Sequence, residues 1–271
     1  MRKALVALVV MGALAVVFPG QARAGAGRFI IRCSYSHTLT DDPIVHFGQP
    51  GASHSHDFYG NVAENAFSTI DTMLGAATTC KTAADPSGYW VPTTLINGAP
   101  VKPIRVITYW EAPANQNVET IPLGLQMIAG DHDSMVPQSI ARVGWACDND
   151  TAGVIHSPML DHPYDCTPYN AAVGHGNGVV ERAIFPSCWD GTGLAPADVT
   201  YPPCRTPYTH KLIRLTARFH LGIMNPEGLT LSSGPATTLH FDFLNAFDPA
   251  RLQGLVTDCL NAHVNCKQVT S

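Results

Sequence analysis

Two histidines, one residue apart, open the segment HSHDFYGN at residues 54–61. In an extended chain His54 and His56 point to one side and Asp57 to the other, because side chains alternate along a strand. An H-x-H pair can offer two imidazoles to one zinc or copper ion, with a third histidine or a carboxylate completing the site. The same groups can also transfer protons, or simply stabilise a polar turn. The motif therefore leaves three interpretations open: a metal site, an acid–base centre and a structural turn.

A second polar pair lies near the C-terminus, in LHFDFLNAFD at residues 239–248. On an extended strand His240 and Asp242 share one face, while Phe241 and Phe243 share the other. A polar pair beside an apolar pair is typical of a strand that lines a pocket, although such a pair can also face water. We predict that this strand and the HSHDFYGN segment meet in one cleft. The candidate catalytic residues are His54, His56, Asp57, His240, Asp242 and Asp190.

Carboxylates and aromatic rings in these polar stretches favour chemistry on sugars. Glycosidic bonds are commonly cleaved by an acid and a base or nucleophile on either side of the sugar. Aromatic faces can stack on sugar rings, although each aromatic residue can equally pack in a core. The candidate substrate-binding residues are Tyr59, Asn61, Tyr89, Trp90, Trp189 and Asn245. The sequence contains no G-x-S-x-G, H-E-x-x-H or phosphate-binding glycine loop. It therefore lacks the motifs by which serine hydrolases, zinc metalloproteases and nucleotide-binding enzymes are most easily recognised.

The first 24 residues have the pattern of a secretory signal peptide. Two basic residues precede an apolar run, and Ala22-Arg23-Ala24 is a small-residue cleavage pattern, which predicts cleavage after Ala24. The run is shorter than the roughly 20 apolar residues of a membrane helix. We therefore expect a secreted, extracellular protein whose mature part is a single β-rich domain over residues 25–271.

Charge restricts the class of partner. Removal of the signal peptide takes away three of the 16 basic residues and none of the 21 acidic ones, so the formal charge falls from −5 to −8. Nucleic acids and anionic membranes need clustered lysine and arginine, so we expect neither as a partner. We expect the mature protein to be a monomer.

All eight cysteines lie after the signal peptide. An even number of cysteines in an exported chain predicts four disulfides, and no C-x-x-C spacing indicates a zinc ribbon or a redox site. Cys259 and Cys266 are close enough in sequence to predict a local bridge. The cysteines are Cys33, Cys80, Cys147, Cys166, Cys188, Cys204, Cys259 and Cys266.

The remaining pattern predicts mostly strands. Segments rich in β-branched or aromatic residues and bounded by Gly, Pro, Asn or Asp are expected at 28–34, 101–110, 123–128, 179–185, 212–221, 229–231 and 238–244. Helices are expected only at 65–72 and 249–259, the latter with Asp248 as its cap. The predicted fold is mainly β: a single-domain antiparallel β-sandwich, jelly-roll-like, with long loops, few short helices and disulfide staples.

Six collinear motifs resemble a known family. They are DDPIVHFGQPGASHSHDFYGN, SGYWVPTTL, LGLQMIAGD, GWACDN, IFPSCWDG and HFDFLNAFD, and the resemblance extends from about Cys33 to Cys259. The chain thereby resembles the exported fungal and bacterial family called domain of unknown function nineteen-ninety-six. The resemblance implies an extracellular location and an association with cell-wall or biomass polysaccharide. Ala246 and Phe247 depart from the NGWD ending expected of that family, which changes a turn and an aromatic surface.

The leading hypothesis is a secreted carbohydrate-active enzyme, of glycoside hydrolase type, that cleaves a cell-wall or biomass polysaccharide through a His/Asp cluster. One alternative is a non-catalytic polysaccharide-binding or wall-associated protein. The other is a metalloprotein with His54, His56 and His240 as ligands. No cofactor is predicted, with a divalent metal as the alternative. Cleavage after Ala24 leaves Gly25 first, so the amino-terminal histidine brace of copper polysaccharide oxidases is not available.

Overall fold

The main sheet of this protein is formed by strands in which buried residues often alternate with more exposed ones. The computed structural model describes residues 25–148, 157–171 and 178–270. Its ten-stranded sheet has the order β7-β15-β3-β2-β1-β6-β13-β9-β8, and β16 pairs with β1. The strands are β1 (Gly27–Leu39), β2 (His56–Gly60), β3 (Gly88–Pro92), β6 (Arg105–Ala112), β7 (Gln126–Gly130), β8 (Val143–Asp148), β9 (Gly178–Ile184), β13 (Arg214–His220), β15 (His240–Leu244) and β16 (Asn265–Gln268).

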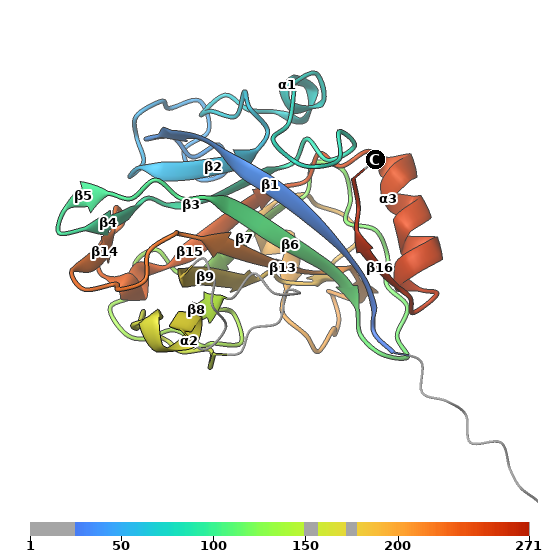
Figure 1. The fold of residues 1–271 in the computed structure, drawn as a ribbon. Coiled ribbons are helices and arrows are strands. Elements are labelled where there is room, and N and C mark those ends of the chain that lie inside the picture. Colours follow the sequence, from blue (N-terminus) through green and yellow to red (C-terminus); the bar gives the residue numbers. More distant parts are fainter. Residues whose placement is uncertain (1–24, 149–156, 172–177, 271) are drawn as a thin grey trace, which may run out of the picture.

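The long strand β1 joins the two halves of the sheet. Residues from Gly27 to Ser34 pair with β6, and residues from Tyr35 to Leu39 pair with β2. The pairing register shifts between Tyr35 and His37, and such an irregularity increases the bend and twist of a strand. The sheet therefore curls round, and its β7 end approaches β8 and β9 (Figure 1).

The interior of the curled sheet holds the main core. Phe29, Trp110, Phe219, Phe241 and Phe243 are fully buried there. The two packed layers that a β-sandwich requires are opposite walls of this one curled sheet. The prediction of a mainly β, antiparallel, disulfide-stapled fold with few short helices is confirmed.

A second, smaller core covers part of the outer face of the sheet. Phe58, Trp90 and Leu244 pack there with Met73 and Ala246, beneath the long connections that precede and follow β2. Phe58 and Trp90 are paired neighbours on β2 and β3, and their rings stack with centroids 5.7 Å apart. This covered outer face is where the histidine cluster described below lies.

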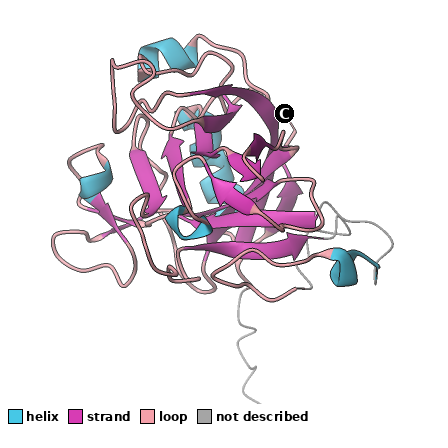
Figure 2. Ribbon diagram, turned by 90° about the vertical axis from the view of Figure 1, so that its left-hand side faces the viewer, coloured by secondary structure: helices cyan, strands magenta, loops and turns pink. Residues whose placement is uncertain are grey.

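Helices are short and lie at the edges of the sheet (Figure 2). The expected helix at 65–72 is only α1 (Ile70–Leu74), which starts later, whereas α3 begins at Pro249 with Asp248 as its cap. The remaining elements are β4 (Thr94–Ile96), β5 (Ala99–Pro100), α2 (Thr167–Ala171), β10 (Cys188–Trp189), η1 (Pro196–Asp198), β11 (Val199–Thr200), β12 (His210–Lys211), β14 (Leu229–Leu231), η2 (Ala236–Thr238), α3 (Pro249–Leu255) and η3 (Val256–Leu260). Among the described residues, no helix has the length and apolar character needed to cross a membrane.

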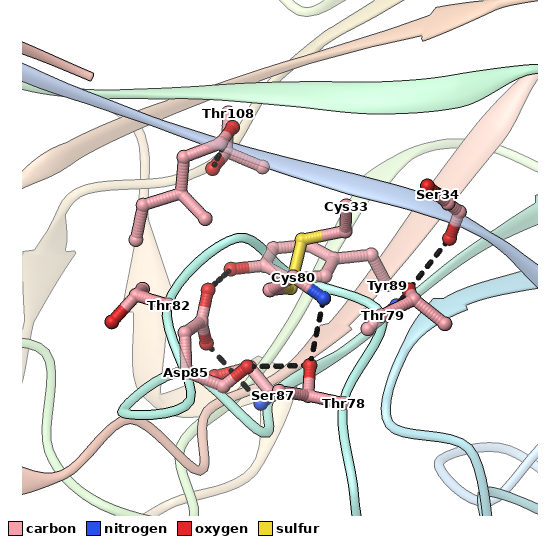
Figure 3. Close-up of a disulfide and its surroundings, with 12 residues drawn as sticks. Cys33, Ser34, Thr78, Thr79, Cys80, Thr82, Asp85, Ser87, Tyr89 and Thr108 are labelled. Carbon is pink, nitrogen blue, oxygen red and sulfur yellow. Dashed lines mark hydrogen bonds between the residues drawn. A yellow bond between two sulfur atoms is a disulfide. The ribbon is translucent and has the colours of Figure 1, made fainter. Parts of the chain in front are cut away.

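Four disulfides staple the fold, and the predicted local bridge Cys259–Cys266 is confirmed. The others are Cys33–Cys80, Cys147–Cys166 and Cys188–Cys204. Figure 3 shows the first of these, which ties β1 to the loop that carries Asp85. The Asp85 carboxylate accepts hydrogen bonds from the Tyr89 hydroxyl at 2.9 Å and the Ser87 backbone at 3.2 Å. Although Asp85 also lies near the two sulfurs, these are bonded to each other, so this group is structural.

Candidate functional site

Strand direction brings the two histidine motifs to the same edge of the sheet. β2 and β15 flank β3 and both run antiparallel to it, so they run in the same direction. Their first residues, His56 and His240, therefore lie at the edge where β3 ends with Pro92. Because β3 lies between them, the backbones of β2 and β15 are two inter-strand distances, or about 10 Å, apart. Two imidazole rings that point toward each other can span this distance.

The Nε2 atoms of three histidines converge there. The His54 Nε2 lies 3.2 Å from the His240 Nε2, and the His56 Nε2 lies 3.4 Å from the same atom. His56 and His240 are buried, whereas His54, two residues before β2, is half-buried. The segments 54–56 and 240 thus meet although 186 residues separate His54 from His240.

Hydrogen bonds fix the tautomer of two of these rings. The His56 Nδ1 lies 3.0 Å from the Asp41 carbonyl oxygen, and the His240 Nδ1 lies 2.8 Å from the Thr238 carbonyl oxygen. A carbonyl can only accept, so each Nδ1 must carry the proton and donate it. In the neutral rings both Nε2 atoms therefore present lone pairs to each other. Such an arrangement is unfavourable unless a cation or a proton lies between them.

Burial keeps the three rings neutral. Desolvation is the main cause that lowers the pKa of His54 to about 4 and of His240 to about 3, and it holds the pKa of His56 well below its usual value. His54 lowers the pKa of His56 and of His240 further, and His240 also lowers that of His56, because a second positive charge nearby is unfavourable. Neutral imidazoles with free Nε2 lone pairs are the form that binds metals.

The spacing of the three nitrogens fits one metal ion. Two nitrogen ligands held at about 2.0–2.1 Å from a tetrahedral zinc lie about 3.3 Å apart. The observed separations of 3.2 and 3.4 Å match that value. Metal-ligating histidines also typically donate their other ring N–H to a carbonyl or carboxylate, as His56 and His240 do here.

Neighbouring backbone groups hold these histidines in place. The Ser55 carbonyl, between His54 and His56, accepts hydrogen bonds from the Thr93 backbone at 2.9 Å and the Ser232 hydroxyl at 2.5 Å. Gly130 pairs with His240 and has a φ of +94°. A Cβ at this position would lie 2.4 Å from the Leu239 carbonyl oxygen, so glycine is required for the close approach.

Buried carboxyl groups adjoin the histidines. Asp42, His56 and Asp242 each offer a ligand atom within 4.8 Å of the other two. One Asp42 oxygen accepts the backbone N–H groups of Ile44 and Val45. In the described part of the chain, neither oxygen of Asp242 has a hydrogen-bond partner. Burial, and then the nearby Asp42 and Glu64, raise the pKa of Asp242 well above its usual value.

A cavity of about 130 Å³ opens beside the cluster. Its lining includes His54, His240, Asp42 and Asp242, together with two further histidines, His46 and His132. Solvent and a small ligand group can therefore reach His54 and His240, whereas His56 does not line the cavity. A closed structural metal site has no such access, whereas a catalytic one keeps an open position.

Asp57 lies on the opposite face of β2 from His56, as strand alternation requires. It accepts hydrogen bonds from the hydroxyls of Thr38 at 2.5 Å and Thr93 at 3.2 Å, and burial raises its pKa to about 6. Its acidic neighbour in the interior is Glu181, whose pKa burial raises to about 8. Asp57 therefore belongs to an internal polar group and is separated from the cavity by the sheet.

The aromatic and amide side chains expected to bind sugar are mostly buried. Tyr59, Tyr89 and Trp90 have no exposed surface, so they cannot stack on a sugar in this structure. The Asn61 amide donates to the Met73 and Pro86 carbonyls, and the Asn245 amide donates to the Ile121 and Pro122 carbonyls. The two asparagines therefore fix loops.

Trp189 is the last residue of β10, in the small sheet formed by β11, β10 and β12, and Asp190 follows that strand. The Asp190 carboxylate accepts hydrogen bonds from the backbone and hydroxyl of Thr192, and these bonds hold its pKa below the usual range. The indole of Trp189 donates to the Gly193 carbonyl at 2.7 Å. Neither residue lines the cavity.

Sequence reasoning missed four residues of the site. Asp42, His46 and Glu64 lie in the connections around β2, and His132 follows β7. Asp42 and His46 belong to the same motif as the H-x-H pair, DDPIVHFGQPGASHSH, which was a signal that they share its environment. Glu64 and His132 carry no such signal, because their approach depends on how the loops fold back.

Comparison with known proteins leaves the site without a characterised template. No curated protein and no solved structure matches this chain. Residues 42–247, which include His54, His56 and His240, match the family described as "Domain of unknown function (DUF1996)". Since the match covers most of the sequence and contains all three histidines, the chain belongs to this DUF1996 family.

Proposed function

We propose that this protein is an exported metalloenzyme in which His54, His56 and His240 hold one divalent transition metal ion. The observation that carries the proposal is the convergence of two Nδ1-protonated rings, His56 and His240, whose Nε2 lone pairs face each other 3.4 Å apart. A bound cation removes the repulsion between these lone pairs. Imidazole ligands suit zinc and copper among the common metals.

The cavity beside the histidines supports catalysis over a purely structural role. It gives water access to His54 and His240, and Asp42 and Asp242 lie at its wall. A zinc ion with three histidine ligands and an open position lowers the pKa of a bound water to about 7. Asp42 and Asp242, which each have a carboxyl oxygen within 4.8 Å of a ring nitrogen of His56, would complete the ligand set of a bound ion or accept a hydrogen bond from a water on it.

Carbohydrate polymer remains our proposed substrate class, and hydrolysis the proposed reaction. The support is the resemblance of the whole motif series to an exported family associated with polysaccharide. The proposal does not include stacking of sugar rings on Tyr59, Tyr89 or Trp90, because all three side chains are buried. Substrate contact would rest instead on polar groups at the cavity mouth, such as His46 and His132.

Metal content tests the proposal directly. The protein is stripped with a chelator, dialysed separately against zinc and copper, and measured by elemental analysis. We expect one equivalent in the wild type and less than a tenth of that in His54→Ala/His56→Ala. His162→Ala removes an exposed histidine that contacts Asp161, and it should bind metal like the wild type. Equal binding by the double variant, or no binding by the wild type, would refute the site.

A further inference from the structure

The outer face of β1, β6, β13 and β9 carries an unusual concentration of arginine. Residues on these strands that point away from the main core include six arginines and one acidic residue, Glu111. We call this set the arginine face; its basic members are Arg28, Arg32, Arg105, Arg182, Arg214 and Arg218, all of them partly exposed. It takes six of the 16 basic residues of the chain and one of its 21 acidic residues.

Strand register places these side chains in rows across the sheet. Arg32 and Arg218 both pair with Ile107, and Arg218 pairs on its other side with Arg182. One row therefore holds three arginines, with Arg218 and Arg182 directly opposite each other. Like charges in directly opposite positions destabilise a sheet. Burial, followed by Arg218 and Arg214, lowers the pKa of Arg182 accordingly.

Contacts within the face only partly offset this repulsion. Arg214 forms an ion pair with Glu111 at 2.8 Å. The guanidinium of Arg218 lies 4.4 Å from the centre of the Tyr109 ring and donates to its hydroxyl at 3.2 Å. Arg28 lies over the same ring at 5.8 Å. These contacts orient the guanidinium groups of Arg28, Arg214 and Arg218, while the balance of charge on the four strands remains strongly positive.

We infer that the arginine face is a docking surface for a carboxylated polysaccharide, such as a polymer rich in uronic acid. Guanidinium groups match carboxylates with two parallel hydrogen bonds, and their fixed rows on a sheet can bind successive carboxylates of an extended chain. The inference does not rest on the metal site. The histidine cluster lies on the outer face of β2, β3 and β15, a different part of the sheet.

Charge and aromatic content favour an acidic polysaccharide over nucleic acid. Outside the arginine face the chain has 10 basic residues against 20 acidic ones, so any polyanion is repelled where it extends past the face. This repulsion is stronger for double-stranded DNA, which has one negative charge per about 1.7 Å, than for a polyuronate, which has one carboxylate per sugar ring. Single-stranded nucleic acids also need exposed aromatic rings for base stacking. Tyr109, whose ring lies beneath Arg218, is only 3% exposed.

Affinity electrophoresis through gels that contain polygalacturonate tests the inference. The matched gels contain a neutral β-glucan or double-stranded DNA, and each is run at low and at high salt. We expect the wild type to be retarded by polygalacturonate at low salt, more weakly at high salt, and to migrate freely through the neutral glucan. Arg28→Gln/Arg32→Gln/Arg182→Gln should weaken the binding at least about tenfold.

The control is Arg205→Gln/Arg251→Gln, which removes two positive charges outside the arginine face and should change the affinity less than about twofold. If the triple variant does not fold, the single variants Arg28→Gln and Arg182→Gln replace it, each with a smaller loss expected. Absence of retardation, an undiminished affinity in the arginine variants, or equally strong retention by DNA would overturn the inference. Metal content in the same variants should stay at the wild-type level, so the two proposals fail separately.

Discussion

Replacing His240 by alanine should remove most of the stabilisation of this protein by zinc. His240 is the ring whose Nε2 lies close to both other Nε2 atoms, so His240→Ala leaves two nitrogens with no common partner. Loss of a residue that merely orients a ligand typically costs 10–100-fold in metal affinity, and loss of the ligand itself should cost more. We therefore expect at least about a hundredfold weaker zinc binding in His240→Ala.

The size of the effect follows from linkage. A ligand that binds only the folded state adds about 2.7 kcal/mol at a free concentration of 100 times its Kd. For a chain of about this length, each 1 kcal/mol shifts Tm by roughly 2–4 °C. Zinc at that concentration should therefore raise the Tm of the wild type by about 5–11 °C. The same concentration is no more than about the Kd of His240→Ala, so its Tm should rise by about 1–2 °C at most.

The assay is thermal unfolding of chelator-stripped protein, followed by circular dichroism, with and without zinc. His162→Ala serves as the matched control, because it removes an exposed histidine and should keep the full shift. A shift of equal size in wild type and His240→Ala would show that zinc acts elsewhere. No shift in the wild type, despite a native fold, would refute the lone-pair reasoning.

Three further predictions concern the surroundings of the site. Burial raises the pKa of Glu181 to about 8, so between pH 4.5 and 8 the folded state binds more protons than the unfolded state. The free energy of unfolding therefore falls as pH rises through this range. Glu181→Gln should remove roughly 3–5 kcal/mol of this fall, measured by urea unfolding at several pH values between 4.5 and 8. Phe241→Ala should cost about 3–5 kcal/mol in the same assay because its ring is fully buried, whereas Phe67→Ala, at a position 57% exposed, should stay within about 0.5 kcal/mol. Gly130→Ala should weaken zinc binding about 10–100-fold in a dialysis assay, because the added Cβ would clash with the backbone beside His240. The control is Gly48→Ala: Gly48 also has a positive φ, but no atom lies within 4 Å of an added Cβ, so zinc binding should not change.

Strands were predicted best where one face of the strand is buried and the other is exposed to solvent. The alternation in KLIRLTARFHLGI led to β13 (Arg214–His220), within two residues at its start and one at its end. β2 and β3 escaped notice because all five residues of each strand are buried, so neither shows alternation. Their outer face is covered by loops, and no local pattern reveals that cover.

The site was predicted in part for the same reason. Strand periodicity correctly separates His56 from Asp57, yet the leading hypothesis placed both in one cleft. In the structure His56 joins the histidine cluster, while Asp57 accepts a hydrogen bond from Thr93 on the opposite face of β2. Trp90 was proposed to stack on a sugar because aromatic faces can do so, but the second core buries it. The clustering of arginines depends on pairing between β1, β6, β13 and β9, which lie far apart in the chain, so composition alone could not show it.

The position of the three histidines makes a bound metal ion a topological cross-link. The disulfides close loops of 47, 19, 16 and 7 residues, and none of them joins β2 to β15. An ion shared by His54 and His240 closes a loop of 186 residues and ties the two motifs from opposite ends of the chain together. By loop-closure entropy this constraint is worth about 1 kcal/mol more than that of the longest disulfide loop. In the proposed metalloenzyme, supply of the metal would then govern how long the folded chain resists proteases, separately from any turnover.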